Sequence, residues 1–305
     1  MKKILFFAVA IILLSGEQIW ASKLLAKYYL ASTFASITNT EYSGQIKAMG
    51  DTVRIRTVPD ITISTYVKGQ ELSYESPESA NVDLVIDKGK TFAFSADDID
   101  KKQADVNYLD AWASDAGEQM KIAIDSDILN TIDGDAHASN KGATAGVKSA
   151  SFNMGVVGTP IGITTSNVLD YIVHANTVLS EQNIPQTDRW MVIPAWMNNL
   201  ILRSDLKAAD FSGDSESMIR NGKIGRIGNF TIYESNNYTA TTDGAFTAYS
   251  VLFGHKSATC FAAQMTKMET LRNPKTFGDL VRGLSVYGFK TVQPKSLGVL
   301  YCYKG

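Results

Sequence analysis

The sequence has little of what metal binding, disulfide formation or thiol catalysis requires. It contains 2 cysteines and 3 histidines in 305 residues. Cys260 and Cys302 form no CxxC motif and lie in apolar contexts, which favours buried free thiols, with a single disulfide as the alternative. The histidines His137, His174 and His255 are too far apart in the chain to suggest a ligand cluster. We therefore expect no metal and no cofactor.

The common catalytic motifs are also missing. The chain has no serine nucleophile elbow, no Walker loop and no HExxH zinc motif. The glycines at 222, 225 and 228 do not match GxGxxG and precede a predicted strand, so they indicate turns and not a phosphate site. Asp125 and Asp127 point to different faces of a predicted helix and make a poor carboxylate pair. The sequence predicts no enzyme.

No apolar run is long enough to span a membrane. The longest, Ile4 to Leu14, has 11 residues, whereas a spanning helix needs about 20. Behind Lys2 and Lys3 it has the form of a secretory signal, but neither possible cleavage site, after Gly16 or after Ala21, has a small residue at the −3 position. A buried N-terminal arm and a misassigned start codon are the alternatives. We expect no membrane partner.

Neither sign of charge dominates, since the formal net charge is −2. The charge is nevertheless uneven: +1 for residues 1–96, −9 for 97–188 and +6 for 189–305. A uniformly basic nucleic-acid binder would instead show a concentrated positive stripe. The pattern is typical of a protein whose acidic surface meets a basic one, within one molecule or on a neighbouring copy.

A β-ribbon is predicted between Ser43 and Ser95. Val53, Ile55 and Thr57 alternate with two arginines, and Ile61, Ile63 and Thr65 resume the alternation. Val82, Leu84 and Ile86 show the same alternation, with two acids at intervening positions. Turns are predicted at 68–69 and 87–90, and Phe92 and Phe94 continue the strand beyond the second. An isolated ribbon is marginally stable in water, so this one should lie on something else, plausibly another subunit.

One long amphipathic helix follows. Its predicted N-cap is Ser95 to Asp98, and apolar residues recur at three- and four-residue spacing to about Ile132. A helix of about 35 residues is about 50 Å long, which indicates an extended subunit with a spine.

The remaining chain mixes both element types. Residues 133–162 read as loop, 166–183 as a helix, 189–193 as a strand stopped by Pro194, and 195–203 as a short helix. Four more strands are predicted at 230–233, 248–253, 258–265 and 280–291. The fold class is α+β.

Four segments, in this order, resemble segments of the major capsid proteins of tailed bacteriophages. Residues 44–53 (GQIKAMGDTV) resemble the start of their extended hairpin, and residues 188–194 (DRWMVIP) resemble a strand–proline–helix passage of their axial domain. Residues 222–236 (GKIGRIGNFTIYESN) resemble their glycine-punctuated segment, and residues 277–288 (FGDLVRGLSVYG) their closing strand.

The resemblance implies the Hong Kong ninety-seven fold and a shell subunit that self-assembles into hexamers and pentamers around double-stranded DNA. It divides the chain into an N-terminal arm (1–42), an extended hairpin (43–96), a spine helix with peripheral domain (97–164), an axial domain (165–265) and a peripheral return strand (266–305). It implies a place in the virion after assembly in the bacterial cytoplasm. Scaffolding, portal and decoration proteins are possible partners, and DNA would be bound without sequence specificity.

Two alternatives stay open: an encapsulin-like compartment around cargo, and a secreted or periplasmic binding protein with a cleaved signal. For the capsid interpretation we hypothesise that the hairpin of one subunit lies across the acidic spine of its neighbour. The candidate contact residues are Arg54, Arg56 and Lys68 on the hairpin and Asp98 and Asp105 on the spine.

Overall fold

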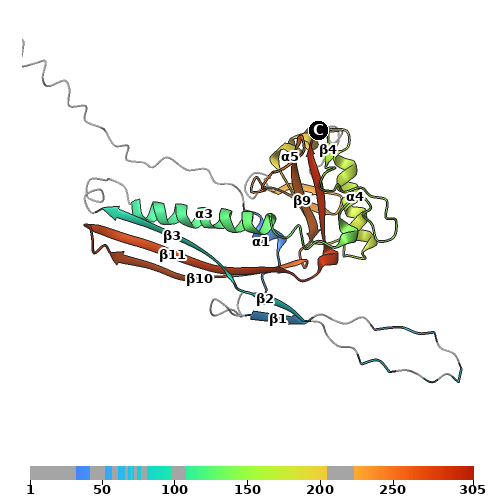
Figure 1. Cartoon of the computed structure of the whole chain (residues 1–305), viewed down its shortest axis with the longest axis horizontal. Helices are drawn as coiled ribbons and strands as arrows, with labels where there is room; N and C mark the ends of the chain where they lie inside the picture. The colour runs from blue at the N-terminus through green and yellow to red at the C-terminus, as the bar shows by residue number, and fades with distance from the viewer. Residues whose placement is uncertain are drawn as a thin grey trace, which may run out of the picture.

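The computed structural model describes residues 32–41, 52–56, 61–65, 68–69, 71, 74–76, 81–97, 108–204 and 223–305. These residues form two units that adjoin end to end, one compact and one long and narrow, and a two-stranded hairpin lies beside the long unit (Figure 1). The mixture of helix and sheet confirms the α+β class.

The compact unit is built on a seven-stranded sheet. Its strand order is β4 (Ile161–Ile163), β12 (Leu297–Lys304), β9 (Phe246–His255), β5 (Arg189–Ile193), β7 (Phe230–Glu234) and β6 (Lys223–Ile227), and β8 (Thr241–Asp243) pairs with β9. Strand β5 is buried over its whole length. Met191 and Ile193 on one face share a core with helices α4 (Val168–Glu181) and α5 (Ala195–Arg203), while Trp190 and Val192 join a second core. Burial on both faces explains why β5 reads as a continuous apolar run.

The first residue of β5 is a buried arginine without a carboxylate partner. The Arg189 guanidinium donates to the carbonyl oxygens of Pro185 (2.8 Å), Asn176 (3.0 Å) and Ile184 (2.6 Å), and to Asn176 Oδ1 and Ser180 Oγ. Burial lowers the pKa of Arg189. The arginine thereby ties β5 to the last turn of α4, whose carbonyl groups favour a nearby positive charge.

The long unit is an antiparallel sheet of β10 (Thr259–Arg272), β11 (Gly278–Thr291) and β3 (Lys88–Asp97), with helix α3 (Tyr108–Leu129) lying along it (Figure 1). Strand β9 of the compact unit leads within a few residues into β10. Ile124 and Ile128 of α3 share a core with Trp190 of β5 and Tyr287 of β11, so both units are packed around one continuous set of apolar side chains.

Smaller elements complete the fold. The hairpin pairs β1 (Thr52–Arg56) with β2 (Asn81–Val85), and the short helix α1 (Phe34–Ile37) packs near α3. Two 3₁₀ turns, η2 (Ala138–Asn140) and η4 (Pro294–Ser296), flank the start of β12. None of the helices in the described ranges is long and apolar enough to cross a membrane.

Several predicted elements are confirmed: the antiparallel hairpin, the helix begun by Asn167, and the strand–Pro194–helix passage. The predicted loop 133–162 is confirmed except at its end, where Ile161 and Gly162 lie in β4. The start of the spine helix is wrong, because Ser95, Ala96 and Asp97 lie in β3 opposite Leu280, Asp279 and Gly278 of β11. Ladder hydrogen bonds with β11 outweigh the local capping preference there.

Three further predictions are wrong. The turn at 87–90 is absent, since β3 begins at Lys88 and Gly89 pairs with Val286. Residues 61–65 are in no strand. The region 266–305 is more than a peripheral return, because β12 lies between β4 and β9 in the compact unit. The other domain boundaries stay predictions, as does the character of residues 1–31, which lie outside the described residues.

Candidate intersubunit surface

The hairpin carries its charge on one face. Arg54 lies opposite Asp83, and its Nε donates to Asp83 Oδ1 at 3.0 Å. The hydrogen bond and charge of Asp83 hold the pKa of Arg54 above its ordinary value. Arg56 lies opposite Asn81 and is exposed. Arg54 thus forms an ion pair within the hairpin, whereas the residue opposite Arg56 on the paired strand is not an acid.

The other face of the hairpin is apolar and seats on the long sheet. Val53, Ile55, Leu84 and Ile86 form a small core with Cys260 and Ala262 of β10 and Val286 of β11. The backbone of the hairpin also crosses β11 closely at Gly288. A Cβ added there would overlap the carbonyl oxygen of Val85 and lie 3.1 Å from the Cα of Ile86. Glycine is therefore required where the hairpin leaves the sheet.

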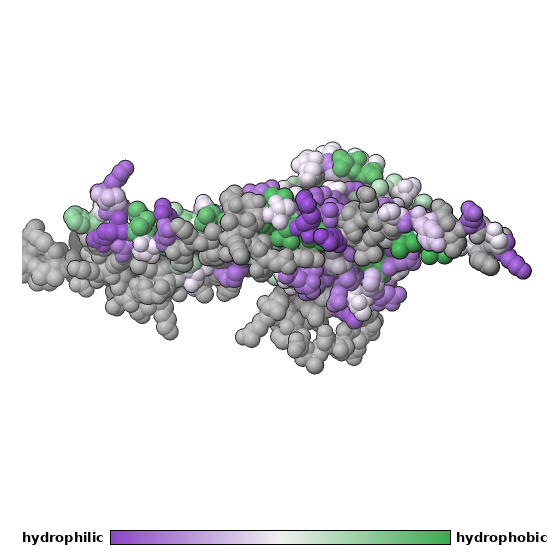
Figure 2. All heavy atoms as spheres, turned by 90° about the horizontal axis from the view of Figure 1, so that it is seen from below, coloured by the Kyte–Doolittle hydropathy of each residue, from purple (hydrophilic) through white to green (hydrophobic). Residues whose placement is uncertain are grey.

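Beyond the paired part, large apolar side chains face solvent. Ile63 is 89% exposed, Tyr74 is 91% exposed and Ile61 is 64% exposed. Lys68 lies in an exposed turn with Gly69, the turn that the sequence predicted. In Figure 2, which shows the molecule from below, the described hydrophobic residues form small groups among hydrophilic ones. Exposed apolar side chains on a protruding ribbon are typical of a surface that a partner covers.

The acids predicted on the spine fall into two groups. Asp98 and Asp105 lie outside the described residues, so no contact with them can be drawn. Asp125 and Asp127 of α3 face inward and bond within the subunit. At least these two carboxylates are unavailable to a neighbouring hairpin, which the segment charge of −9 did not reveal.

Asp127 binds the long sheet. Tyr287 donates its hydroxyl to Asp127 Oδ2 at 2.6 Å, and Lys88 Nζ lies 3.8 Å from the same oxygen and 5.0 Å from the ring centre of Phe289. Burial and the bond to Asp127 raise the pKa of Tyr287. Helix α3, β3 and β11 are therefore tied together by one carboxylate.

Asp125 is a buried, fully hydrogen-bonded acid whose environment sequence reasoning missed. It is fully buried, and its carboxylate accepts hydrogen bonds from Thr33, Phe34 and Asn237 at 2.6–2.7 Å. These donors come from the N-terminal arm and from the loop after β7. The available signal was an acid next to Ile124, inside the apolar stripe of a predicted helix.

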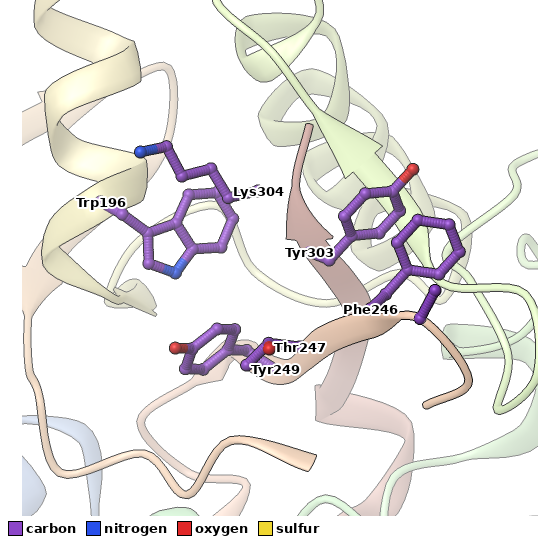
Figure 3. A pocket seen from close by; sticks show the side chains of 7 residues that line it. Trp196, Phe246, Thr247, Tyr249, Tyr303 and Lys304 are labelled. Carbon is purple, nitrogen blue, oxygen red and sulfur yellow. The ribbon is translucent and has the colours of Figure 1, made fainter. Parts of the chain in front are cut away.

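A hollow of about 580 Å³ opens between α5, β9 and β12 (Figure 3). Two ring pairs line it, Trp196 with Tyr249 (5.8 Å between ring centres) and Phe246 with Tyr303 (4.1 Å), and Lys304 stands at its rim. None of its lining residues is a carboxylate, histidine, serine or cysteine. In the described part of the chain, no three His, Cys, Asp or Glu side chains gather as a metal site.

Both cysteines are free and buried, as predicted. Burial, with a smaller effect of Glu41, raises the pKa of Cys260 to about 11, and burial also raises that of Cys302. Relative to the ordinary value of 9.0, the thiolate fraction of Cys260 at pH 8 should fall about 100-fold.

We therefore expect neither thiol to react with iodoacetamide at pH 8 within minutes in the native protein, and both to react in urea. Mass spectrometry of the alkylated peptides measures this. Rapid native labelling of Cys260 would contradict the seating of the hairpin over it.

The family model described as phage capsid protein matches residues 81–300. No curated protein sequence matches the chain. A solved structure from Mycobacterium phage Che8 is 29% identical with a TM-score of 0.70, covering 92% of this chain and 95% of that one.

Two further structures share the fold at 15% identity. They are the capsid of the cyanophage P-SCSP1u, with a TM-score of 0.67 and coverage of 94% of this chain and 92% of that one, and the capsid of Ralstonia phage GP4, with a TM-score of 0.65 and coverage of 95% and 96%. The similarity therefore extends over nearly the whole length of each chain.

Proposed function

The chain belongs to the phage capsid protein family and is a major capsid protein of the tailed-phage type, a subunit of the head shell and so of the virion. From this premise we propose that copies join into hexamers and pentamers through the β1–β2 hairpin, which lies across the spine region of the neighbouring subunit. The family match does not favour a cargo compartment or a secreted binding protein.

The exposed end of the hairpin is the observation that supports this proposal. Ile63 and Tyr74 are each about nine-tenths exposed. When this segment lies on a second copy, their apolar surface would be removed from water, which is favourable. The free face of Arg56 then supplies a charge to meet the acidic region of the neighbour. Because each hairpin contacts a different surface of the next copy, the contact is heterologous and closes into a ring. Lys68, in the same exposed part, is a further candidate contact, and Asp98 and Asp105 remain candidates on the acidic side.

We also propose what this shell contains and how it forms. It encloses double-stranded DNA without sequence specificity, a proposal supported by the match to the phage capsid family. Assembly takes place in the host bacterial cytoplasm, and scaffolding, portal and decoration proteins are candidate partners. The subunit itself carries no catalytic role, in keeping with the absence of catalytic motifs in its sequence.

The test is the charge reversal R56E. Arg56 faces Asn81 and not an acid, so the reversal leaves the hairpin's own ion pair intact. We expect the concentration needed for assembly to rise about tenfold, equivalent to about 1.4 kcal/mol per contact. Negative-stain electron microscopy and size-exclusion chromatography over a dilution series measure it.

The matched control is the swapped pair R54E/D83R, which retains the cross-strand ion pair and the net charge of the hairpin. If the swapped variant assembles normally, Arg54 acts only within its own hairpin. If it assembles less well, Arg54 also contributes to the contact between subunits. Wild-type assembly of folded R56E would contradict the proposed role of Arg56.

A further inference from the structure

A short segment of the N-terminal arm lies where the compact and long units meet. Asn39 pairs with Cys260 at the start of β10: its amide donates to the carbonyl of Thr259 and its carbonyl accepts from Phe261, both at 2.9 Å. Nearby, the ring of Phe34 packs on that of Phe261 at 4.9 Å. The arm thus continues the edge of β10 just after β9 has left the compact unit.

The arm is also held by helix α3 through Asp125. Oδ1 of this carboxylate accepts from the backbone amides of Thr33 and Phe34, both at 2.7 Å, and from the Thr33 hydroxyl at 3.1 Å. Oδ2 accepts from Asn237 Nδ2 at 2.6 Å and from Ser235 Oγ at 3.4 Å. One oxygen therefore serves the arm and the other serves the loop after β7.

That loop is fixed to the compact unit. The Tyr238 hydroxyl donates to the carbonyl of Val192 in β5 at 2.9 Å and accepts from the amide of Leu252 in β9 at 3.2 Å. Asn130, just beyond α3, accepts from the amide of Thr239 at 2.7 Å. Movement of residues 235–239 would therefore disturb the central strands of the large sheet.

We propose that Asp125 couples the arm to this loop, so that residues 33–39, Asp125 and residues 235–239 form a clamp that sets how the compact and long units sit relative to each other. The proposal does not depend on how the hairpin meets a neighbouring subunit. In a shell, the relative position of the two units within a subunit affects its curvature, and the clamp is a place where the arm controls it.

The coupling follows from the chemistry of a buried carboxylate. A fully buried charge must be completely hydrogen-bonded, because each missing donor leaves it poorly solvated. Donors on Oδ2 orient the carboxylate, so less conformational entropy is lost when the arm binds Oδ1. Binding of the arm to Oδ1 favours the ordered loop on Oδ2 by the same free energy. An asparagine at 125 could not replace it, because its amide nitrogen would face donors on whichever side it turned.

The experiment is hydrogen exchange on shells or capsomers of the full chain, read by peptides that cover residues 33–39 and 235–239. The variant N237A removes the 2.6 Å donor on Oδ2 and leaves the Thr33 and Phe34 donors on Oδ1 unchanged. We expect the arm amides to exchange at least about fivefold faster in N237A. The reciprocal variant T33V removes only the hydroxyl donor on Oδ1 and should speed exchange in residues 235–239.

The control is N236A, which deletes the same kind of side chain from the neighbouring exposed position. Among the described residues, its side-chain oxygen accepts one bond, from the Ala195 amide at 3.4 Å, and none of the bonds to Asp125 comes from it. Faster exchange of the arm in N237A alone supports the clamp. Equal acceleration in both variants means general loosening of the loop and overturns it, as does an unchanged arm in N237A.

An engineered disulfide between the arm and β10 gives a second measurement. Because Asn39 and Cys260 are direct partners across a parallel bridge, N39C places a second thiol beside the native one. Under a copper–phenanthroline oxidant, N39C/N237A should form this disulfide and recover wild-type exchange in residues 33–39, while the reduced protein should not. Because burial raises the pKa of Cys260 to about 11, the oxidation is run for hours at pH 9. Failure to crosslink under these conditions would overturn the placement of the arm on β10.

Discussion

Replacing Gly288 with valine is expected to abolish shell formation while the seven-stranded sheet stays folded. An added Cβ at this position would overlap the carbonyl oxygen of Val85, so the hairpin could not cross β11 as it does. The apolar face formed by Val53, Ile55 and Leu84 would lift from the long sheet. At about 1.5–3 kcal/mol per buried side chain, the loss is on the order of 5 kcal/mol.

The measurement is electron microscopy of the purified variant, with near-ultraviolet circular dichroism to follow the aromatic core. G89A is the matched control, because Gly89 is also a strand glycine of the same sheet. A Cβ there would make only ordinary contacts, with Leu284 Cδ1 at 3.8 Å and the Ser285 carbonyl oxygen at 3.9 Å. G288A should show an intermediate loss. Shells of G288V at wild-type yield would mean that the seated hairpin is not needed for assembly.

The hairpin shows which structural features the sequence pattern could predict and which it could not. Alternation in 53–57 and 82–86 predicted both strands and their apolar face, because a half-buried strand leaves a period of two. The pattern could not show that the chain leaves the hairpin at Ile86 and enters a different sheet at Lys88. That choice is made by the ladder with β11, whose residues lie nearly 200 positions later.

The long helix illustrates a second limit. Its apolar spacing identified a spine, and α3 is present from Tyr108 to Leu129. The proposed N-cap failed because Ser95 to Asp97 have a partner strand, and tertiary hydrogen bonds outweigh a local preference worth about 1 kcal/mol. Strand β12 was missed altogether, although LGVLYCY is a continuous apolar run of the kind that fills a buried strand.

The candidate contacts were predicted less well than the fold. Charge counting placed Arg54 and Arg56 together on one face, and they do lie on the same strand. It could not distinguish Arg54, which already pairs with Asp83, from Arg56, which does not oppose an acid. Nor could it separate a buried acid such as Asp125 from a solvated one, because formal charge carries no information on burial.

The second large effect concerns Arg189, and R189A is expected to prevent stable folding of the compact unit. The substitution removes the guanidinium donor from the partly buried carbonyl oxygens of Pro185 and Ile184, while the Asn176 carbonyl keeps the Ser180 hydroxyl as a donor. The lost hydrogen bonds and the lost packing of the buried side chain together cost on the order of 4 kcal/mol. Thermal unfolding of purified subunits should show a midpoint lower by roughly 10 °C, or insoluble protein.

Two variants separate geometry from charge at this site. R189K keeps the positive charge beside the last turn of α4, but a single ammonium group cannot reproduce five bonds spread over a planar guanidinium, so we expect about half of the loss. R203A removes an exposed arginine from the end of α5 and should unfold within about 2 °C of wild type. If R189K unfolded like wild type, charge near the helix terminus would be sufficient. Because β5 is buried on both faces, its loss would remove the sheet itself, and assembly would fail for want of a folded subunit and not for want of a contact.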